Sequence, residues 1–418
     1  MDALPAELVY AVIGQTDYLM LPALALVCAQ WRDLAKKRAA SLAHSVQESQ
    51  QRQHKCRSPL ECMTNYVIKL IDKRQWGLVE WMRTEVLCFA QRDSLYKYVC
   101  AAAAQDGDLV RLQTMCAVGG NFWWYGKVTR RAALGGHMHV LLWLHSIGKL
   151  DRDVVCMSAA KGGHVHILEW ARSIGCPIYV WTCSAAARCG QLDALVWLRK
   201  NGCQWSSDVC DWAAWNGHLH VLQWARSNGC EWTHMACSLA ARRGHLHIVQ
   251  WVIKNGGRWT TSTCSKAAQG GHVDVLMWAL YNGCPMDEHT GTNAAAGGHL
   301  DALRLAHMWG CYLVPRHYSV AAAGGHLHIV EWLYANDCPW YAGMLETAVE
   351  SGHIDVAQWA LDHGCAWRTN MCTTMSREGH LGMLRWAVAN KRPWNKDACL
   401  REARDHGCVY VVEWILSQ

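Results

Sequence analysis

The fold is decided by the stretch Gly229–Gly256, which reads GCEWTHMACSLAARRGHLHIVQWVIKNG. Residues 233–242 favour a helix, because they contain good helix formers and no proline, and Thr233 is a suitable N-cap. Gly244 ends this helix, since glycine adopts the left-handed conformation of a C-cap without strain. A second helix is expected at 246–254, where apolar residues cover a broad face, and Asn255-Gly256 closes it. The stretch therefore predicts helix, tight turn, helix and loop.

This stretch is one copy of a repeat, in which Gly-His is followed six residues later by an apolar residue, usually Trp. Successive anchors are evenly spaced, in ten copies without an insertion or deletion. The anchors are His137, His164, Gln191, His218, His245, His272, His299, His326, His353 and His380. Weaker copies lie at Asp108 before this run and at Cys408 after it. Since neither helix of a copy can bury its apolar side alone, the copies must stack on one another.

The copies resemble the ankyrin repeat over roughly residues 95–418. Residues 238–245 match that family's LAAxxGH core, and residues 246–251 match its second helix, with Trp in place of a Leu. Residues 229–232 match the family's GADV, with Cys for Ala and Trp for Val. The copies are shorter than ankyrin units of about 33 residues, and the shortening falls between Trp232 and Cys237, where the family has a β-hairpin. The resemblance implies an all-α, ankyrin-like helical solenoid of 27-residue units with almost no strand.

Tryptophan recurs in two columns, and the chain has 25 Trp against 2 Phe. One column lies in the second helix, six residues after the anchor. The other lies thirteen residues before the anchor and consists of Trp124, Trp205, Trp232, Trp259, Trp340, Trp367 and Trp394. We interpret both columns as large rings that fill the space between repeats. The alternative, which the period alone does not exclude, is an aromatic ladder on which nucleic-acid bases stack.

Cysteine also recurs in two columns among the 22 Cys of the chain, and histidine recurs in His-x-His pairs such as His245 and His247. The Cys columns are Cys176, Cys203, Cys230, Cys284, Cys311, Cys338 and Cys365, and Cys156, Cys183, Cys210, Cys237 and Cys264. They lack the C-x(2–4)-C spacing typical of zinc sites, so we interpret the thiols as small apolar core residues. Residues two apart on a helix do not face each other, so we assign the histidines to turn chemistry at the helix start.

The sequence gives no support for an active site. It contains no H-E-x-x-H, P-loop or G-x-S-x-G motif. We therefore expect no catalytic residues, no enzymatic activity, no cofactor and no bound metal, with a metalloprotein kept as the alternative reading of the Cys and His columns.

Residues 1–45 are out of phase with the repeat. Leu4-Pro5-Ala6-Glu7-Leu8 opens a helix with Pro in its first turn. Residues 27–35, VCAQWRDLA, follow at the separation found in an F-box, and the segment resembles that three-helix family. The resemblance implies docking on a Skp-type adaptor of a cullin ubiquitin ligase, through Leu4, Pro5, Leu8, Ile13, Leu21, Val27, Cys28, Trp31 and Leu34. The alternative is that these residues form only the core of a capping bundle. Residues 46–94 are expected to be a linker and a degenerate helical repeat region.

The combination resembles F-box and ankyrin-repeat proteins of large DNA viruses of amoebae. It implies a substrate-recruiting subunit whose solenoid binds an unknown target protein. The alternative is a repeat scaffold or decoy that binds host proteins without recruiting the ligase. Candidate target-binding residues are those just before Gly-His that vary between copies, although drift on an unselected surface would give the same variation: Lys161, Arg188, Trp215, Arg242, Arg243 and Gln269.

Charge and hydropathy narrow the expected partners and compartment. The formal net charge is +6, on 40 basic and 34 acidic residues. Because basic residues form no long run, we expect no nucleic-acid partner. The apolar stretch 18–29 is shorter than the roughly 20 residues that span a bilayer, so we expect no membrane partner. The N-terminus lacks the basic region of a secretory signal. We expect a soluble, intracellular monomer, in the host cytoplasm or nucleus if the protein is viral.

Overall fold

The structure, a computed structural model, describes residues 89–117 and 125–418. These residues form 24 α-helices and no strand. The prediction of an all-α helical solenoid is therefore confirmed. The F-box-like segment and its nine candidate docking residues lie outside the described residues, as does Trp124. Among the helices described, none combines the length and the apolar character needed to cross a membrane.

The chain divides into two compact units, Met1–Tyr179 and Val180–Gln418. The described helices of the first unit are α6 Phe89–Asp106, α7 Leu109–Ala117, α8 Tyr125–Gly135, α9 Met138–Ser146, α10 Arg152–Gly162 and α11 Val165–Ser173. The helices of the second unit are α12 Trp181–Arg188, α13 Leu192–Lys200, α14 Asp208–Trp215, α15 Leu219–Ser227, α16 Met235–Arg242, α17 Leu246–Lys254, α18 Thr261–Gly270, α19 Val273–Tyr281, α20 Glu288–Gly297, α21 Leu300–Met308, α22 Pro315–Gly324, α23 Leu327–Ala335, α24 Met344–Ser351, α25 Ile354–Asp362, α26 Met371–Arg377, α27 Leu381–Ala389, α28 Lys396–Asp405 and α29 Val409–Ser417.

Helices α16 and α17 form the repeat Gly229–Gly256. Helix α17 has the predicted bounds, and Gly244 before it has a φ of +76°. Helix α16 begins two residues later than predicted. The hydroxyl of Thr233 accepts a hydrogen bond from the Met235 N–H at 3.0 Å, and His234 is the N-cap residue. Thr233 therefore serves the helix start from one position further out than expected.

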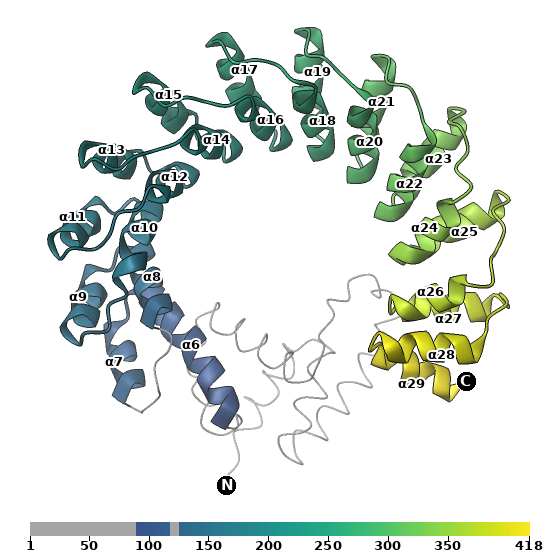
Figure 1. Cartoon of the computed structure of the whole chain (residues 1–418), viewed down its shortest axis with the longest axis horizontal. Coiled ribbons are helices and arrows are strands. Elements are labelled where there is room, and N and C mark those ends of the chain that lie inside the picture. Colours follow the sequence, from purple (N-terminus) through teal and green to yellow (C-terminus); the bar gives the residue numbers. More distant parts are fainter. Residues whose placement is uncertain (1–88, 118–124) are drawn as a thin grey trace, which may run out of the picture. The chain divides into compact units, whose positions relative to one another are not determined.

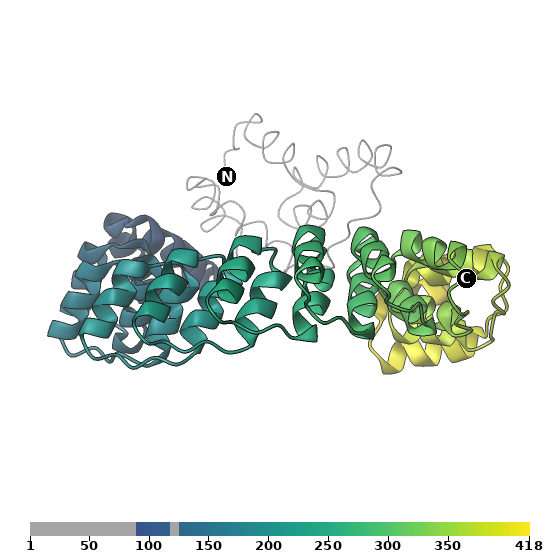
Figure 2. The same ribbon diagram turned by 90° about the horizontal axis from the view of Figure 1, so that it is seen from above.

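In the second unit, the even-numbered helices form an inner row and the odd-numbered helices form an outer row (Figure 1). Successive inner helices contact one another along the row. Their facing positions hold small residues such as Ala240 and Ala241, both fully buried, and small side chains allow helix axes to approach closely. The outer helices bring larger residues, such as Ile248 and Val249, to the same core. Because the inner side chains are smaller, this row is concave on its inner side. Figure 2 shows the loops between repeats running along one edge of the stack.

The tryptophan columns are less deeply buried than the sequence interpretation implies. Trp251 of α17 and Trp232 of the loop before α16 are only half-buried, and the largest fully buried side chains are mainly Leu and Ile. Within each of six repeats, the loop ring contacts the helix ring, with centroids 5.5–6.2 Å apart. The rings also contact the preceding repeat, since the Arg226 guanidinium carbon lies 4.6 Å from the Trp232 ring centroid and the Tyr334 ring lies 5.5 Å from that of Trp359. They therefore lie partly between repeats, but they are only half-buried because the facing inner and outer helices already fill the core.

Candidate functional site

Anchor histidines of the second unit join their own repeat to the repeat before it. The Nε2 atom of His245 lies 3.2 Å from the carbonyl oxygen of Trp215, and that of His218 lies 3.2 Å from the carbonyl oxygen of Arg188. His326, His353 and His380 make the same bond at 2.9–3.2 Å. A carbonyl oxygen can only accept, so Nε2 carries the hydrogen and donates it. We call this contact the histidine lock.

The histidine lock corrects the expectation that these residues serve the turn of their own helix. Each locking histidine occupies the N-cap position of the second helix, yet its side chain makes no capping hydrogen bond there. The lock instead satisfies a carbonyl at the C-terminal end of the previous first helix, where carbonyls lack helical partners. The second histidine of some pairs binds the turn that follows the same helix, since His220 Nε2 lies 3.1 Å from the Gly190 carbonyl oxygen.

A glycine of the previous repeat makes room for each locking ring. Gly217 has a φ of +85°, and a Cβ atom there would lie 2.9 Å from Cε1 of His245. Gly229 has a similar φ of +82° but open space around the same position. Gly217 is therefore required for two reasons, its left-handed backbone and the ring above it, whereas Gly229 is required only for the first.

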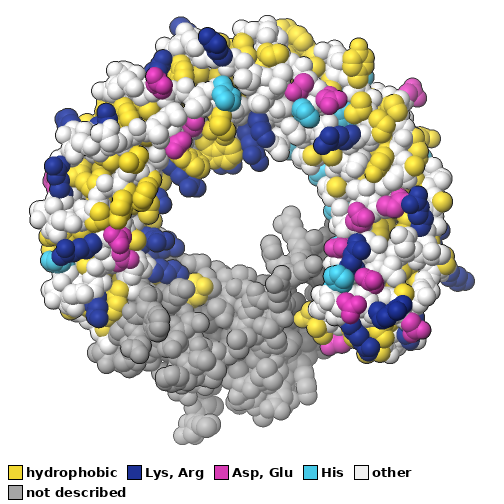
Figure 3. Space-filling model, viewed as in Figure 1, with side chains coloured by type: hydrophobic (Ala, Val, Ile, Leu, Met, Phe, Trp, Pro, Cys, Tyr) yellow, Lys and Arg dark blue, Asp and Glu magenta, His cyan; other side chains and the backbone are white. Residues whose placement is uncertain are grey.

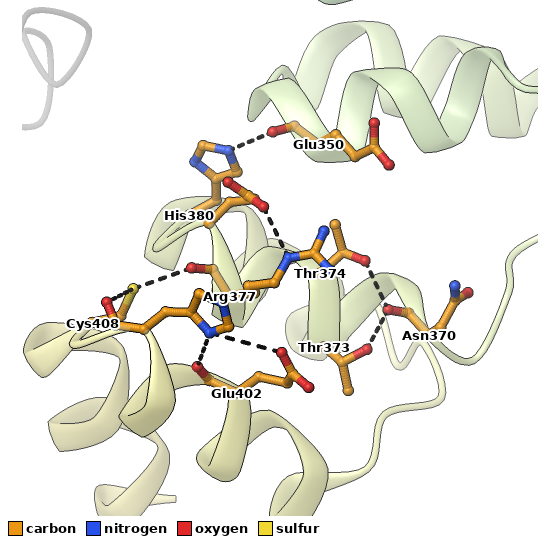
Figure 4. A network of polar contacts seen from close by, with 10 residues as sticks. Glu350, Asn370, Thr373, Thr374, Arg377, His380, Glu402 and Cys408 are labelled. Carbon is orange, nitrogen blue, oxygen red and sulfur yellow. Dashed lines mark hydrogen bonds and ion pairs between the residues drawn. The ribbon is translucent and has the colours of Figure 1, made fainter.

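Figure 4 shows how the last repeats are joined. The His380 Nε2 atom donates to the Glu350 carbonyl oxygen at 2.9 Å. In the next repeat Cys408 takes the place of the histidine, and its Sγ atom lies 3.4 Å from the Arg377 carbonyl oxygen. The lock is thus kept with a weaker thiol donor.

The carbonyls held by the locks belong to the column three residues before each anchor, which includes the predicted positions Arg188 and Trp215. Their backbone is therefore fixed to the following repeat. The structure brings four of the six predicted solenoid residues together, on α12, on α14 and at the C-terminal end of α16. The guanidinium carbons of Arg242 and Arg243 lie 5.5 and 5.4 Å from the Trp215 ring centroid.

A second cation–π contact extends this cluster. The Arg188 guanidinium carbon lies 4.8 Å from the ring centroid of Trp212, which is exposed on α14. We call Arg188, Trp212, Trp215, Arg242 and Arg243 the Arg–Trp face. Basic side chains, in dark blue, lie on part of the inner rim in Figure 3. Cation–π contacts at exposed sites contribute about 0.5–1 kcal/mol each, so these arginines keep much of their charge available to a partner.

The positive charge of the Arg–Trp face comes from arginine. Arg188, Arg242 and Arg243 are exposed, and in the described ranges no carboxylate forms an ion pair with any of them. Burial lowers the pKa of His218 and His245, more than their carbonyl bonds raise it, which favours neutral rings. Asp211, which directly precedes Trp212, accepts a hydrogen bond from the Thr233 hydroxyl at 3.0 Å. Burial raises the pKa of this carboxyl.

The other two predicted solenoid residues have different surroundings. Lys161 is half-buried on α10, in the first unit. Gln269 is half-buried on α18 and accepts a hydrogen bond from the Lys266 Nζ atom at 3.0 Å. Within the described part of the chain, no three His, Cys, Asp or Glu side chains gather in a way that could hold a metal ion.

Sequence reasoning missed Trp212, and one signal could have found it. Trp212 belongs to neither tryptophan column, and the same is true of Trp181 at the start of α12. Both are exposed, with 37% of the Trp212 surface and 56% of the Trp181 surface accessible. A tryptophan outside the repeating frame has no packing role that the other copies share, which makes it a candidate surface residue.

No family model matches the chain, and no curated protein matches it. Among solved structures, it is similar to the pentatricopeptide repeat protein PPR10 in complex with an 18-nt psaJ RNA element, with 14% identity and a TM-score of 0.37. It is also similar to a form of that protein with three cysteines replaced by serine, in complex with the same element, with 13% identity and a TM-score of 0.37. Each match covers 98% of this chain and 67% of the other. PPR10 from maize matches with 15% identity, a TM-score of 0.33 and coverage of 98% and 69%.

These matches correct one expectation from the sequence. The absence of a long basic run predicts no nucleic-acid partner. Two of the matched chains are described in complex with RNA, and this prediction is not kept. The positive charge here is assembled from separate repeats, and a search for consecutive basic residues does not detect such a surface.

Proposed function

We propose that the chain is a protein-interaction adaptor whose Arg–Trp face binds an acidic segment of a partner protein. The observation that carries this proposal is the set of three exposed arginines, from α12 and the C-terminal end of α16, placed over two tryptophans of α14. Trp and Arg are the residue types that dominate binding energy at protein interfaces. A partner carboxylate can receive two parallel hydrogen bonds from one guanidinium group.

The same helices also offer apolar contacts. Trp181 at the start of α12 and Met235 at the start of α16 are exposed over 56% and 45% of their surface. An acidic segment that also carries apolar side chains would find partners for both kinds of group along these helices. The histidine locks support such a role, because they hold the backbone of Arg188 and Trp215 before any partner arrives.

A protein segment fits this face better than a single-stranded nucleic acid. Sequence-tolerant binding of bases uses aromatic rings whose faces are open for stacking. Here the guanidinium groups of Arg188, Arg242 and Arg243 already lie over the rings of Trp212 and Trp215. A base would have to displace an arginine before it could stack on that side, whereas a carboxylate binds the arginine where it stands.

The second part of the proposal concerns the N-terminus. The F-box resemblance of residues 1–45 supports recruitment of a Skp-type adaptor, and through it a cullin ubiquitin ligase, to the target on the solenoid. The resemblance of the whole combination supports a source among large DNA viruses of amoebae, with a host protein as the target. The alternative is a scaffold or decoy that binds the target and recruits no ligase.

The face is tested with the full chain and a fluorescein-labelled peptide of alternating Glu and Tyr. We expect saturable binding that weakens with added salt, and at least tenfold weaker binding after Arg188→Gln, Arg242→Gln and Arg243→Gln together. The matched control replaces Arg258, Arg304 and Arg316, which are exposed elsewhere in the second unit, with Gln and should leave binding within twofold. The proposal fails if both triple variants lose binding equally, or if a uridine-rich RNA of equal length binds while the peptide does not.

The N-terminal part is tested separately by co-purification of the full chain with a Skp-type adaptor. Retention that is lost after Leu4→Ala with Trp31→Ala supports ligase recruitment. Peptide binding by the same variant should be unchanged, which shows that the solenoid still folds. If the adaptor is not retained, or is retained equally by the variant, the scaffold alternative stands.

A further inference from the structure

The two cysteine columns meet between successive repeats. A cysteine of one first helix, such as Cys210, faces a cysteine 20 residues later, here Cys230, in the loop that leads to the next first helix. The Cys210 Sγ atom lies 3.9 Å from the Cys230 carbonyl oxygen. In three places a hydrogen bond between the two side chains shifts the pKa of both thiols: Cys183 with Cys203, Cys210 with Cys230, and Cys264 with Cys284. We call these the three thiol pairs. Their members are buried, with at most 8% of the residue surface exposed.

Within each pair the two thiols are unequal. The hydrogen bond from the helix thiol lowers the pKa of the loop thiol, against the opposing effect of burial, at Cys203, Cys230 and Cys284. The pKa of each helix thiol is raised, first by the same hydrogen bond and then by burial. The loop sulfur is therefore the better nucleophile of each pair, since the thiolate is the reactive form.

Loop cysteines that face a residue other than cysteine show what the facing thiol does to the pKa. Cys311 faces Gly291, Cys338 faces Tyr318 and Cys365 faces Leu345, and burial raises the pKa of all three thiols. The lowered pKa thus follows the facing thiol and not the loop position itself. Cys156 and Cys176 share the spacing, but the pKa of Cys176 is raised by burial, so this pair is left out.

One glycine gives the distance between the two columns. Gly291 occupies the helix column, and a Cβ atom built on it would lie 2.9 Å from the Sγ atom of Cys311. Disulfide geometry places each Cβ about 3 Å from the sulfur across the bond. The backbone of two stacked repeats therefore holds these columns at a separation that a disulfide can bridge.

We propose that the three thiol pairs are oxidation sites, at which a hydroperoxide converts each facing dithiol to a disulfide that links neighbouring repeats. The loop thiolate attacks the peroxide, the O–O bond breaks, and a sulfenic acid forms as water or alcohol leaves. The helix thiol then attacks the sulfenic sulfur, the S–S bond forms, and water leaves. With hydrogen peroxide, the two thiols lose two electrons and two protons, and two molecules of water are produced.

Each disulfide would join one inner helix to the loop before the next, namely α12 to α14, α14 to α16 and α18 to α20. Repeats contact only their neighbours, so a covalent link between two of them removes their freedom to separate. The inference does not depend on the proposed binding function. Because Cys203 retains 8% exposure and Cys230 only 1%, we expect the Cys183–Cys203 bond to form before the Cys210–Cys230 bond.

The test treats the reduced full chain with increasing hydrogen peroxide, blocks remaining thiols with N-ethylmaleimide and identifies linked peptides by mass spectrometry without reduction. Cys189 is exposed and reports that oxidant has reached the protein. We expect the three linked peptides to appear. Cys237 and Cys338, which face no thiol of the other column, should stay reduced and be found modified by N-ethylmaleimide. Oxidation should raise the midpoint of thermal unfolding, and dithiothreitol should reverse the rise.

Two variants make the result decisive. Cys183→Ser should remove the Cys183–Cys203 peptide and leave the other two linked peptides unchanged. Cys237→Ser lies in the same column, but its counterpart in the loop column is Gly257, so all three linked peptides should persist. The proposal is overturned if the paired thiols are still reduced, and are therefore modified by N-ethylmaleimide, when Cys189 is fully oxidised. It is also overturned if Cys237 and Cys338 oxidise as readily as the pairs, or if the disulfides join other cysteines.

Discussion

The carbonyl oxygen of Trp215 and the Nε2 atom of His245 lie 3.2 Å apart, so a residue of the candidate binding face is held by the frame of the next repeat. The glycine two residues after Trp215 lies under the same imidazole. Backbone conformation, ring position and hydrogen bond therefore depend on one another across two repeats, and a substitution at either residue should be felt at the other.

Gly217→Ala tests this dependence, because its effect has two parts. The alanine must adopt a φ of +85°, and its Cβ would press on His245. Gly229→Ala is the control, since it meets the first difficulty and not the second. We expect Gly217→Ala to lower the free energy of unfolding by about 1 kcal/mol more than the control, as measured by urea unfolding. In a His245→Ala background this excess should vanish, and an excess that persists there would contradict the lock.

His317 should make stability depend on pH. Its side chain is fully buried, its Nδ1 atom accepts the Val314 N–H at 3.1 Å, and burial lowers its pKa to about 4 despite the nearby Glu288. The folded state therefore favours the neutral ring. Its contribution is complete above the unfolded value of about 6.5 and is lost progressively as pH falls towards 4, by up to about 3 kcal/mol. Urea unfolding between pH 7 and 4 should show a steeper loss than in His317→Gln, and equal slopes would refute the assignment.

The two rings of a tryptophan pair should be energetically coupled, but each should contribute modestly to the free energy of unfolding. Trp232 and Trp251 are half-buried with ring centroids 5.6 Å apart, whereas Ile248 is fully buried. We expect Ile248→Ala to lower the free energy of unfolding by about 2–5 kcal/mol and Trp251→Ala by less. A double-mutant cycle of Trp232→Ala and Trp251→Ala should give a coupling of about 0.5–1.5 kcal/mol. A coupling near zero would show that the ring contact contributes nothing to stability.

Features set by neighbouring residues could be predicted from the sequence, whereas contacts between residues far apart in the chain could not. The repeat length, the bounds of α17 and the turn at Gly244 follow from local propensity and period, and they are confirmed. The acceptor of His245 lies 30 residues earlier, and the thiols of Cys210 and Cys230 are 20 residues apart. Neither relation exists until two repeats stack at a particular separation. The half-burial of Trp251 was missed because periodicity distinguishes the apolar side of a helix but not the depth of each position.

The sequence also predicts the candidate site only in part. Variation before Gly-His identified Arg188, Trp215, Arg242 and Arg243, which the structure brings together. It also identified Gln269, which bonds Lys266 instead, and Lys161, which belongs to the first unit. Variation marks positions that the frame leaves open, and it carries no information on which neighbours those side chains meet. Trp212 was missed because it lies one helical turn before the variable position, where the other copies show no regular pattern.

The last lock can be strengthened, because Cys408 occupies a position that histidine holds elsewhere. Its Sγ atom lies 3.4 Å from the Arg377 carbonyl oxygen, and a Cβ on Gly379 would lie 3.2 Å from that sulfur. An imidazole N–H is a stronger donor than a thiol. We expect Cys408→His to stabilise α28 and α29 by about 0.5–1.5 kcal/mol and Cys408→Ala to destabilise them. Hydrogen exchange of the Lys396–Asp405 and Val409–Ser417 amides should slow in the first variant and quicken in the second. Equal exchange in both would mean that the terminal repeat is held by its apolar contacts alone.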